Sequence, residues 1–429
     1  MSEQREDVVV IGGGAIGACC ADALARAGRS VLLLERGKLC SGSSWGNAGL
    51  LTTSSAAPEA APGVMLQAAR WQFDRDGPFR FRPRLDRRLA AWTWEFHKRC
   101  NATTARESTT FLRDLVRRDI DLVRSQAEEA TRDFELRTNG LVVLYDTEEG
   151  MTEGLKRAGA LAELGIPFEP LDRAGVLRLE PRVSSQIVGG VLHPDDSHLD
   201  PGEYVRAVAE LAEARGARIR ERTPVLRLHG AHRVEAVETP GSLIRPELVV
   251  LAAGAWSPSL VPGAPMLVEA GKGFSVSCDV GSTVYERPLR LGEIRTIVRS
   301  VGGTVRVTSK LDLVGIDERA NERRARSGVS RAARYVELPV GIEAAPPWSG
   351  FRPLAPDGLP YIGRTAAAGN VIVATGHGHL GISLAAVTGE AVAGIASGAK
   401  VAFDLERVRP DRFGADARRR QRRARRLTS

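Results

Sequence analysis

The chain has 429 residues, of which 43% are hydrophobic and 26% charged, and this composition excludes a disordered or fibrous protein. Its length predicts about two or three domains, or one large interleaved unit, with a core that needs no disulfide or metal. The formal net charge of +8 at pH 7 indicates, on its own, an acidic partner such as nucleic acid or an anionic membrane. Residues 418–426, however, hold seven arginines and no acidic residue, so the surplus belongs mostly to a C-terminal tail.

The first 35 residues predict a β-α-β unit. The apolar runs at 7–11 and 30–35 are typical of strands buried on both faces, and the small residues between them predict a helix that ends at Gly28. The N-terminus lacks the pattern of a signal peptide, and no run of about 18 apolar residues is present to cross a bilayer. The five cysteines form no CxxC pair. We therefore expect a cytoplasmic protein without a metal, with peripheral membrane attachment left open.

The rest of the chain alternates helices with buried and antiparallel strands. The expected elements, in chain order, are a helix at 85–130, a strand at 139–146, a helix and connection at 150–180, a helix at 202–216, antiparallel strands at 218–239, a buried strand at 247–253, an antiparallel sheet at 266–340, a buried strand at 371–375 and a helix at 382–397. Because the buried strands are scattered, the simplest architecture is α/β, with a doubly wound nucleotide-binding domain and an inserted α+β substrate domain that has an antiparallel sheet. The expected segments are 1–75, 195–265 and 345–410 for the first domain, 76–194 and 266–344 for the second, and 411–429 for the basic tail.

Gly12, Gly14 and Gly17 form a GxGxxG pattern between the first strand and its helix. In such a turn the first glycine permits the tight bend, the second lets a pyrophosphate approach the backbone, and the third allows close helix packing. The helix N-terminus offers free N–H groups to the phosphates, and Glu35 is placed to accept hydrogen bonds from ribose hydroxyls. The pattern predicts a dinucleotide site, and an ordinary glycine-rich turn is the alternative.

The run of small residues at 41–51, SGSSWGNAGLL, bears on the choice between NAD and FAD. Such a loop can pass beneath a pyrophosphate and a flavin ring, where large side chains would clash. A flexible Ser/Gly linker is the alternative. The acidic Glu35 argues against a 2′-phosphate on the ribose.

Four stretches carry a family resemblance: VVVIGGGAIGACCADALARAGRSVLLLE at the start, SGSSWGNAGLL, WSGFRPLAPDGLPYIG at 348–363 and ATGHGHLGISLAAVTGEAVA at 374–393. Together they resemble the FAD-dependent amino-acid oxidoreductases of the D-amino-acid oxidase and glycine oxidase type, and most of all the bacterial D-amino-acid dehydrogenase branch. Their order and spacing cover nearly the whole chain except the tail. They are specific for the family and much weaker on the substrate.

The resemblance implies an FAD cofactor. In relatives, the segment matching 377–382 wraps the flavin edge, where N–H groups and a helix dipole stabilise the negative charge of the reduced ring. Some relatives carry a histidine bonded covalently to FAD at the position of Gly46, and glycine cannot form that bond, so noncovalent FAD is expected. The residues expected to contact FAD are Gly12, Gly14, Ala15, Ile16, Gly17, Glu35, Arg36, Ser43, Ser44, Asn47, Ala48, Gly49, Leu51, Val225, Ala253, Gly254, Trp256, Gly378, His379, Leu380, Gly381 and Ile382.

The resemblance also implies a substrate site at Arg352. In relatives the matching arginine forks onto the substrate α-carboxylate, which orients the α-carbon beside the flavin, and a surface salt bridge is the alternative. His379 is a candidate general base, with a structural histidine as the alternative. Lys310 stands where dehydrogenase relatives have a small pair, so it either acts near the flavin or points to solvent. His198 is expected to line the substrate entrance.

These expectations define a reaction: oxidative deamination of a free D-amino acid or a cyclic imino acid, such as D-alanine-like substrates, D-proline or hydroxyproline. A hydride leaves Cα for flavin N5, and the electrons pass to a quinone or a partner protein. An oxygen-using glycine or sarcosine oxidase and a subunit of a larger dehydrogenase complex remain alternatives, whereas Arg352 disfavours a non-catalytic nucleic-acid-binding flavoprotein. The tail either contacts an anionic membrane, binds nucleic acid nonspecifically or is a solvated extension.

Overall fold

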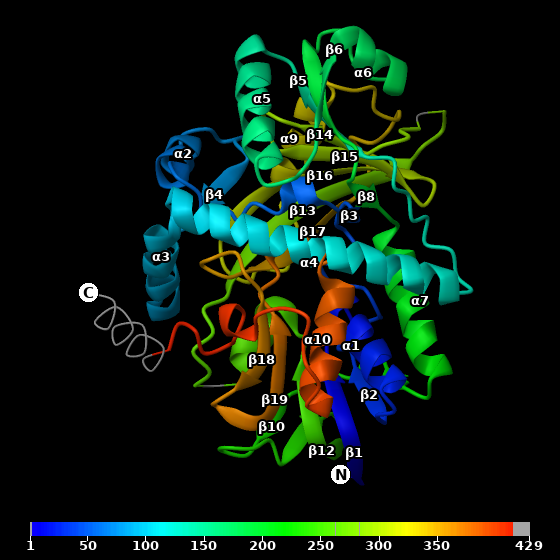
Figure 1. The fold of residues 1–429 in the computed structure, drawn as a ribbon, viewed down its shortest axis with the longest axis vertical. Coiled ribbons are helices and arrows are strands. Elements are labelled where there is room, and N and C mark those ends of the chain that lie inside the picture. Colours follow the sequence, from blue (N-terminus) through cyan, green and yellow to red (C-terminus); the bar gives the residue numbers. More distant parts are fainter. Residues whose placement is uncertain (1, 262, 283, 415–429) are drawn as a thin grey trace.

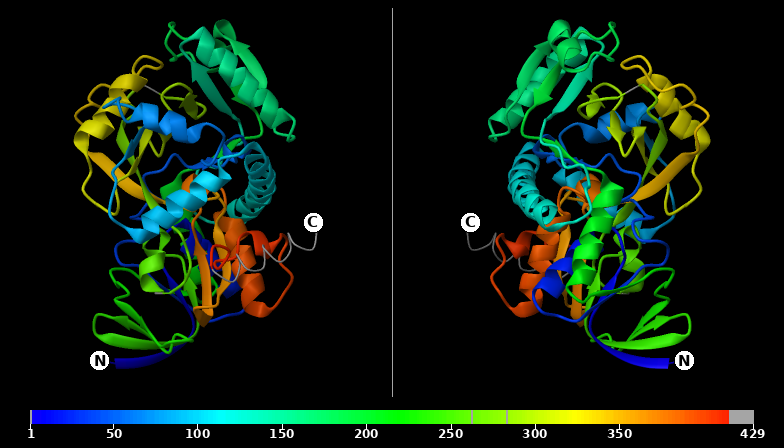
Figure 2. Two further views of the ribbon diagram at one scale, coloured as in Figure 1. Left: turned by 90° about the vertical axis from the view of Figure 1, so that its left-hand side faces the viewer. Right: turned by 90° about the vertical axis from the view of Figure 1, so that its right-hand side faces the viewer.

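The structure is a computed structural model that describes residues 2–261, 263–282 and 284–414, so the arginines at 418–426 lie outside the described residues. It contains two large sheets, one toward each end of the long axis, and the long helix α4 (Ala102–Glu129) crosses the molecule between them (Figure 1). Residues 141–193 form the end of the molecule opposite the N-terminus (Figure 2).

The first sheet has eight strands and a parallel centre. Its central strands run parallel in the order β19, β12, β1, β2 and β9, so the start, the middle and the end of the chain meet in one sheet. Antiparallel pairs at the edges add three strands. The strands are β1 (Ser2–Ile11), β2 (Val31–Leu34), β9 (Arg218–Arg220), β10 (Arg227–His229), β11 (Ala236–Thr239), β12 (Ser242–Leu251), β18 (Tyr361–Thr365) and β19 (Ala368–Thr375).

Three helices cover one face of this sheet: α1 (Ala15–Arg26), α7 (Pro201–Ala214) and α10 (Ala385–Ser397). Along β1, Val8 and Val10 pack toward these helices, whereas Val9 and Ile11 pack into the core on the opposite face. All four side chains are buried, and this two-sided burial is the reason why a continuous apolar run marks the strand in the sequence.

The second sheet has nine strands and is mixed. The strands between 269 and 354 pair antiparallel as expected, but β5 pairs parallel with β14 and β4 pairs parallel with β16. The inserted sheet is therefore mixed rather than purely antiparallel, because four of its strands, β4 to β7, come from an earlier part of the chain and two of them pair parallel with the later strands. Its strands are β4 (Phe79–Phe81), β5 (Leu141–Tyr145), β6 (Glu169–Asp172), β7 (Gly189–His193), β13 (Glu269–Asp279), β14 (Leu289–Leu291), β15 (Thr296–Val301), β16 (Thr304–Leu313) and β17 (Pro347–Leu354).

The border expected at residue 345 falls before β17, yet β17 pairs with β13 in the second sheet. The division of the chain into domains stays a prediction, and this strand passes from one sheet region to the other. The helix expected at 85–130 is two helices, α3 (Arg87–Arg99) and α4, because Asn101 caps α4 by accepting a hydrogen bond from the Thr104 N–H at 2.9 Å.

The remaining elements are short or lie at the periphery. They are β3 (Leu50–Leu51), β8 (Ser197–His198), α2 (Val64–Trp71), α5 (Glu148–Ala162), α6 (Arg173–Leu179), α8 (Ser257–Leu260), α9 (Glu322–Ala332) and the 3-10 turns η1 (Thr53–Ser55), η2 (Gly254–Trp256), η3 (Gly378–Leu380) and η4 (Leu405–Arg407). The predicted mixed helix-and-sheet architecture, with a parallel sheet that starts from the β-α-β unit, is confirmed.

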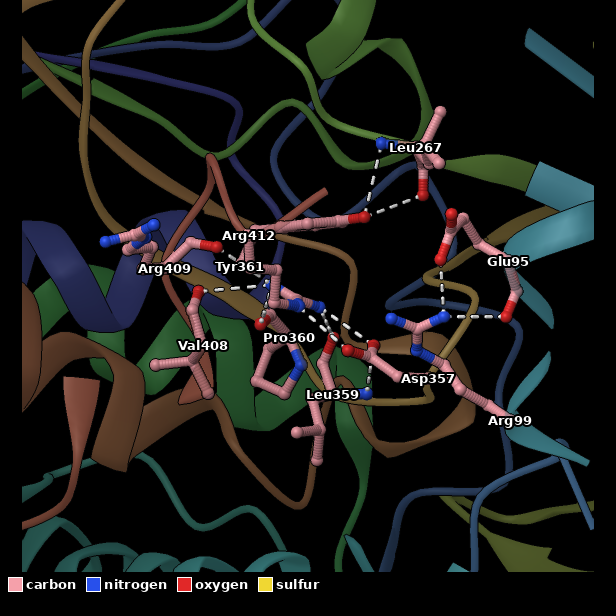
Figure 3. Close-up of polar contacts among 10 residues, drawn as sticks. All are labelled: Glu95, Arg99, Leu267, Asp357, Leu359, Pro360, Tyr361, Val408, Arg409 and Arg412. Atoms are coloured by element: carbon pink, nitrogen blue, oxygen red, sulfur yellow. Dashed lines mark hydrogen bonds and ion pairs between the residues drawn. The ribbon is translucent and has the colours of Figure 1, made fainter. Parts of the chain in front are cut away.

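The last described segment is fastened to the loop after β17. Arg412 makes a bidentate salt bridge with Asp357, at 2.8 and 2.9 Å, and donates to the Leu359 carbonyl at 2.7 Å (Figure 3). Its guanidinium also lies 3.9 Å from the centroid of the Tyr361 ring. These contacts hold the chain against the body of the molecule as far as Gly414, and they brace the loop that follows Arg352.

Candidate active site

A cavity of about 720 Å³ lies at the carboxyl ends of β1, β2, β12 and β19. The chain leaves these four strands at Gly12, Glu35, Ala252 and Thr375, and all four residues line the cavity. Parallel strands place their carboxyl ends at one edge of a sheet, which is where α/β proteins bind nucleotides. This space is called the first cavity below.

The glycine turn after β1 is shaped by close backbone packing. Gly12 has φ +111°, and a Cβ there would lie 2.5 Å from the Ala252 carbonyl oxygen. A Cβ on Gly17 would lie 1.8 Å from the Gly12 carbonyl oxygen, so α1 reaches the turn only with glycine at this position. Gly14 is the N-cap of α1 and carries no side chain to bond the helix amides, which leaves the helix N-terminus open toward a phosphate.

Glu35 is fixed at the mouth of the same cavity. Its Oε2 accepts a hydrogen bond from the Gly13 N–H at 2.7 Å, and Oε1 accepts one from the Gly37 N–H at 2.8 Å. Each oxygen keeps a lone pair that can accept a hydroxyl donor such as that of a ribose. Arg36 and Trp256 form the adjacent wall, with the guanidinium 4.0 Å from the centroid of the indole ring.

The loop at 41–51 runs along the first cavity and connects it to β17. Ser44 Oγ accepts a hydrogen bond from the Ala15 N–H at 3.0 Å. Ser43 Oγ donates to the Phe351 carbonyl at 2.6 Å and accepts from the Phe351 N–H at 3.0 Å. The loop is therefore ordered by its own small polar side chains, which the alternative of a free Ser/Gly linker does not explain.

Two buried arginines of the second sheet hold this loop. Arg299 donates to the Ala48 carbonyl at 2.7 Å, and Arg306 donates to the carbonyls of Trp45 at 2.8 Å and Asn47 at 3.0 Å. The two are cross-strand neighbours on β15 and β16. Burial and the positive charge of Arg306 lower the pKa of Arg299 to about 9. Sequence reasoning missed both residues, because nothing in a strand pattern tells a buried arginine from an exposed one.

Helix α10 begins next to the first cavity. The helix starts at Ala385, and the turn η3 precedes it, so the segment 377–383 that lines the cavity is more tightly wound than the expected helix start at 382. Asp119 of α4 accepts a hydrogen bond from the Val387 N–H at 2.9 Å. Burial raises the pKa of Asp119 to about 8. The start of α10 is thus fixed from the opposite helix.

Most residues predicted to contact FAD line the first cavity. Gly17, Gly49 and Leu51 are the exceptions among these described residues: Gly17 packs on Gly12, a Cβ on Gly49 would lie 2.1 Å from the Leu199 carbonyl oxygen, and Leu51 is buried in β3. The predicted residues that line the cavity are Gly12, Gly14, Ala15, Ile16, Glu35, Arg36, Ser43, Ser44, Asn47, Ala48, Val225, Ala253, Gly254, Trp256, Gly378, His379, Leu380, Gly381 and Ile382.

Arg352 lies on β17 where the first cavity meets a second cavity of about 480 Å³, and it lines both. Its Nη1 donates to the Lys310 carbonyl at 2.9 Å. A Cβ on Gly273 of β13 would lie 3.1 Å from Arg352 Cζ, so the glycine makes room for the guanidinium. Among the described residues no carboxylate forms a salt bridge with Arg352, and donors therefore remain for an anionic ligand.

Lys310 supports Arg352 through its backbone. Its φ of +67° is left-handed, which costs a lysine about 1–2 kcal/mol, and it belongs to a bulge in β16, where Lys310 and Leu311 lie opposite the single residue Gly273 of β13. The Lys310 side chain donates to the Asp76 carbonyl, and burial lowers its pKa to about 8. Lys310 is buried and lines the second cavity but is not among the described residues that line the first, so its side chain follows neither alternative, toward the flavin or toward solvent.

His198 does not match its expected position at the substrate entrance. It is 4% exposed, and among the described residues it lines neither cavity. Its Nε2 contacts Asn139 Oδ1 at 2.9 Å, and burial lowers its pKa to about 3, so the ring is neutral. Its strand β8 pairs with β3, and this pairing makes His198 part of the core beneath the loop.

His379 and Glu59 face each other where the cavities meet. His379 Nε2 donates to the Ser55 carbonyl at 2.9 Å, which leaves the Nδ1 lone pair 3.7 Å from Glu59 Oε1. Burial lowers the pKa of His379, with Glu59 opposing, so the ring is neutral near pH 7. Burial acts to raise the pKa of Glu59, but the charges of His379, Arg295 and Arg352 outweigh it and the pKa lies below its usual range.

The neighbouring His377, unlike His379, has a structural role. It is buried, its Nε2 contacts Thr388 Oγ1 at 2.9 Å, and burial lowers its pKa to about 3. Because the Thr388 hydroxyl donates to the Leu384 carbonyl at 2.6 Å, it accepts from His377, and the ring is held as the Nε2–H tautomer.

Sequence reasoning also missed Glu59, Arg290 and Arg295. Arg290 lines the first cavity and donates to Ser55 Oγ, and its only signal was a charge between two buried leucines, Leu289 and Leu291. Glu59 and Arg295 line the second cavity. Both stand in segments without strong periodicity, so their convergence depends on the tertiary fold.

The first cavity has the features that FAD requires. A Cβ on Gly14 would lie 3.0 Å from Ser44 Oγ, so a larger residue there would crowd the serine loop beside the helix N-terminus. A Cβ on Gly46 would lie 2.1 Å from the Trp348 ring, and no side chain, including a histidine for covalent attachment, fits there. The residues present thus fit a dinucleotide that is held without a covalent bond at this position.

Fold and site together define a flavin-dependent oxidoreductase. The chain belongs to the FAD dependent oxidoreductase family, whose profile matches residues 7–395. It is 32% identical over 408 residues to a D-amino acid dehydrogenase of Methylobacterium radiotolerans, covering 91% of this chain and 96% of that protein. Among solved structures it is similar to glycine oxidase from Geobacillus kaustophilus (TM-score 0.73, 25% identity, 95% of this chain and 98% of that chain). The fold of L-proline dehydrogenase from P. horikoshii is also similar (TM-score 0.74, 18% identity, 96% and 98% covered).

No helix in the described ranges combines the length and the apolar character needed to cross a bilayer. Within the same ranges, no group of three or more His, Cys, Asp or Glu side chains is arranged to hold a metal ion.

Proposed function

We propose that the enzyme oxidises a free D-amino acid or a cyclic imino acid. The D-amino acid dehydrogenase relatives support this assignment, and the observation that carries it is Arg352, whose guanidinium lies between the two cavities with donors free. The substrate loses a hydride from Cα and a proton from nitrogen and becomes an imino acid. Water then hydrolyses the C=N bond to a 2-oxo acid and ammonium, whereas a cyclic product stays an imine. When bound, FAD supplies the two-electron acceptor.

Arg352 binds the substrate α-carboxylate through two parallel N–H bonds, which fixes the carboxylate plane. The Lys310 carbonyl and Gly273 set the direction of the guanidinium, because one accepts its N–H and the other leaves it room. Orientation of this kind contributes several kcal/mol to catalysis. The strained backbone at Lys310 thus serves the position of Arg352.

His379 and Glu59 are the proton acceptors at the junction of the cavities. A substrate enters mainly as an ammonium ion and must lose a proton before its nitrogen can donate electrons. His379 Nδ1 has a free lone pair, and Glu59 is ionised at neutral pH. Because the pKa of His379 is lowered, we expect kcat/KM to fall below neutral pH as this ring becomes protonated.

Substitution of Arg352 tests the proposed function. In Arg352→Met, kcat/KM for D-amino acids should fall about 1,000-fold, because a charged, bidentate contact is lost, while the bound FAD fraction stays unchanged. Arg352→Lys should recover only part of the loss. The assay is anaerobic flavin bleaching and dye reduction with D-amino acids, cyclic imino acids and N-methylated glycines. No activity with any of them, or full activity in Arg352→Met, would contradict the proposal.

We also propose that the electrons pass to a quinone and that the basic tail brings the enzyme to an anionic membrane. Exposed apolar side chains near α2 and α3, including Met65, Leu66, Phe73 and Trp94, support this proposal. The described chain ends against α3, where Arg99 lies over the Phe413 ring at 4.7 Å. Full-length protein should sediment with anionic vesicles more strongly than the 1–414 truncation. Equal binding would remove the tail from this role, and binding to DNA alone would favour nucleic acid.

A further inference from the structure

The second cavity has two chemically different ends. One end carries the charged groups Glu59, Arg295, Lys310 and Arg352 and meets the first cavity. The other end is mainly apolar: the rings of Phe79, Phe81, Trp92 and Phe96 line it with aliphatic side chains and with Gln72 and Thr93, whereas the Trp71 ring lies beside Arg295 of the charged end. A volume of about 480 Å³ lies in the usual range for small-molecule sites.

The apolar end offers a ligand mostly carbon surface. Trp92 and Leu354 are buried in one apolar cluster that Phe79 and Phe96 join. The only polar atom of the Trp92 ring donates to the Leu354 carbonyl at 2.8 Å, and the ring stacks on Phe96 with centroids 4.9 Å apart. The surface offered to a ligand is therefore carbon and aromatic faces.

The charged end is largely neutralised by its own contacts. Arg295 lies 3.8 Å from Glu59 and packs over the Trp71 ring at 4.8 Å. The Lys310 ammonium donates to the Asp76 carbonyl. A charged substrate side chain would thus have to displace an existing partner, whereas an α-carboxylate meets the free donors of Arg352.

We propose that the second cavity is the pocket for the substrate side chain, and that the preferred substrates are amino acids with a large apolar or aromatic side chain. This inference rests on the proposed function, because it takes Arg352 as the carboxylate anchor. From that anchor, a side chain that enters the apolar end exchanges water for the aromatic wall. A small side chain leaves the aromatic wall in contact with water, and a charged side chain loses its hydration without gaining a partner.

A series of D-amino acids measures the preference directly. With the holoenzyme and a dye acceptor, kcat/KM should rise at least about 100-fold from D-alanine to D-phenylalanine or D-leucine, since each buried methylene is worth tenfold or more. D-Aspartate and D-lysine should lie below D-alanine. If glycine or D-alanine is the best substrate, or a charged side chain is preferred, the inference is overturned.

A pair of variants in α2 locates the pocket. Ala68 lines the second cavity, and Ala68→Leu should lower kcat/KM for D-phenylalanine at least tenfold while D-alanine changes less than about twofold. Leu66 stands on the same helix, is 60% exposed and is not among the described lining residues, so Leu66→Ala is the matched control and should alter neither substrate. Equal losses for both substrates in Ala68→Leu would contradict the assignment.

A binding measurement removes catalysis from the test. 3-Phenylpropanoate carries the carboxylate and the ring but no amine, so it cannot be oxidised by this reaction. It should quench the fluorescence of the tryptophans at the cavity and bind at least tenfold more tightly than propanoate, and Ala68→Leu should abolish the difference. Equal affinities would overturn the inference. Turnover of small substrates without any size preference would sink this inference alone, whereas no turnover of any substrate would sink the proposed function.

Discussion

The two cavities are built from different materials. The first cavity is made largely of backbone, at glycine turns and strand ends, and its geometry depends on where a Cβ is absent, as at Gly12 and Gly17. The apolar end of the second cavity is made of side chains from α2, β4, α3 and β16. The space for the cofactor is thus specified mainly by backbone, whereas the space proposed for the substrate side chain is specified by side chains that can be replaced.

The sharpest way to break the first cavity alone is Gly17→Ala. The new Cβ would stand 1.8 Å from the Gly12 carbonyl oxygen, so α1 must move away from the turn. We expect FAD affinity to fall at least about 100-fold, seen as lost visible absorbance after gel filtration. Gly159→Ala in α5, where nothing lies within 4 Å of the new Cβ, is the control and should retain FAD with equal or slightly higher stability. Full FAD retention in Gly17→Ala would mean that backbone packing does not define the cavity.

Arg299 connects the second sheet to the first cavity, because its side chain extends from β15 to the loop at 41–51. Arg299→Met leaves the Ala48 and Leu199 carbonyls without this donor and should destabilise the protein by about 2–4 kcal/mol while weakening FAD binding about tenfold. Thermal unfolding and FAD titration measure the two effects. Arg233→Met replaces an exposed arginine and should change neither. If Arg299→Met matches this control, the loop is held by its own serines instead.

Asp119 holds the start of α10 beside the first cavity, and it makes the stability of the folded chain depend on pH. Its pKa of about 8 lies above the value of about 3.9 of an exposed aspartate, so the folded chain binds the proton more tightly. The resulting stabilisation is complete below about pH 4 and is lost as the pH rises through about 8. Asp119→Asn keeps an acceptor for the Val387 N–H and should flatten this part of the profile, with a gain of about 1–3 kcal/mol above pH 8. Urea unfolding across this range measures it, and parallel profiles would contradict the role of Asp119.

The smallest effect is expected at Lys310, on the second cavity. Lys310→Gly relieves the left-handed strain, and Lys310→Ala keeps it, while both remove the same ammonium group. The glycine variant should be more stable than the alanine variant by about 1 kcal/mol, measured as a difference in Tm. Both should keep Arg352 in place, since the carbonyl that binds it remains. An alanine variant as stable as the glycine variant would show that the positive φ costs nothing.

The sequence predicts the residues of the first cavity far better than those of the second cavity. Gly12, Gly14 and Glu35 follow one another in a short β-α-β unit, so local spacing is enough to place them around one cavity. Glu59 and Arg295 meet only because β14, β15 and the loop after η1 converge, and no local pattern carries that information. Family resemblance predicted Arg352, but the part that the Lys310 backbone plays depends on a bulge in β16, where two residues lie opposite Gly273 of β13.

Strand β17 contacts the loop of the first cavity and also lines the second cavity. Phe351 binds the loop of the first cavity through Ser43, and the next residue, Arg352, is the proposed anchor for the substrate carboxylate. Adjacent residues on one strand keep a constant separation, so β17 fixes the distance between the cofactor loop and the proposed carboxylate anchor. The walls of the second cavity at α2 and β4 are not part of β17. Redesign of the substrate range can therefore proceed there, by exchanging side chains, while the distance between carboxylate anchor and cofactor loop stays fixed.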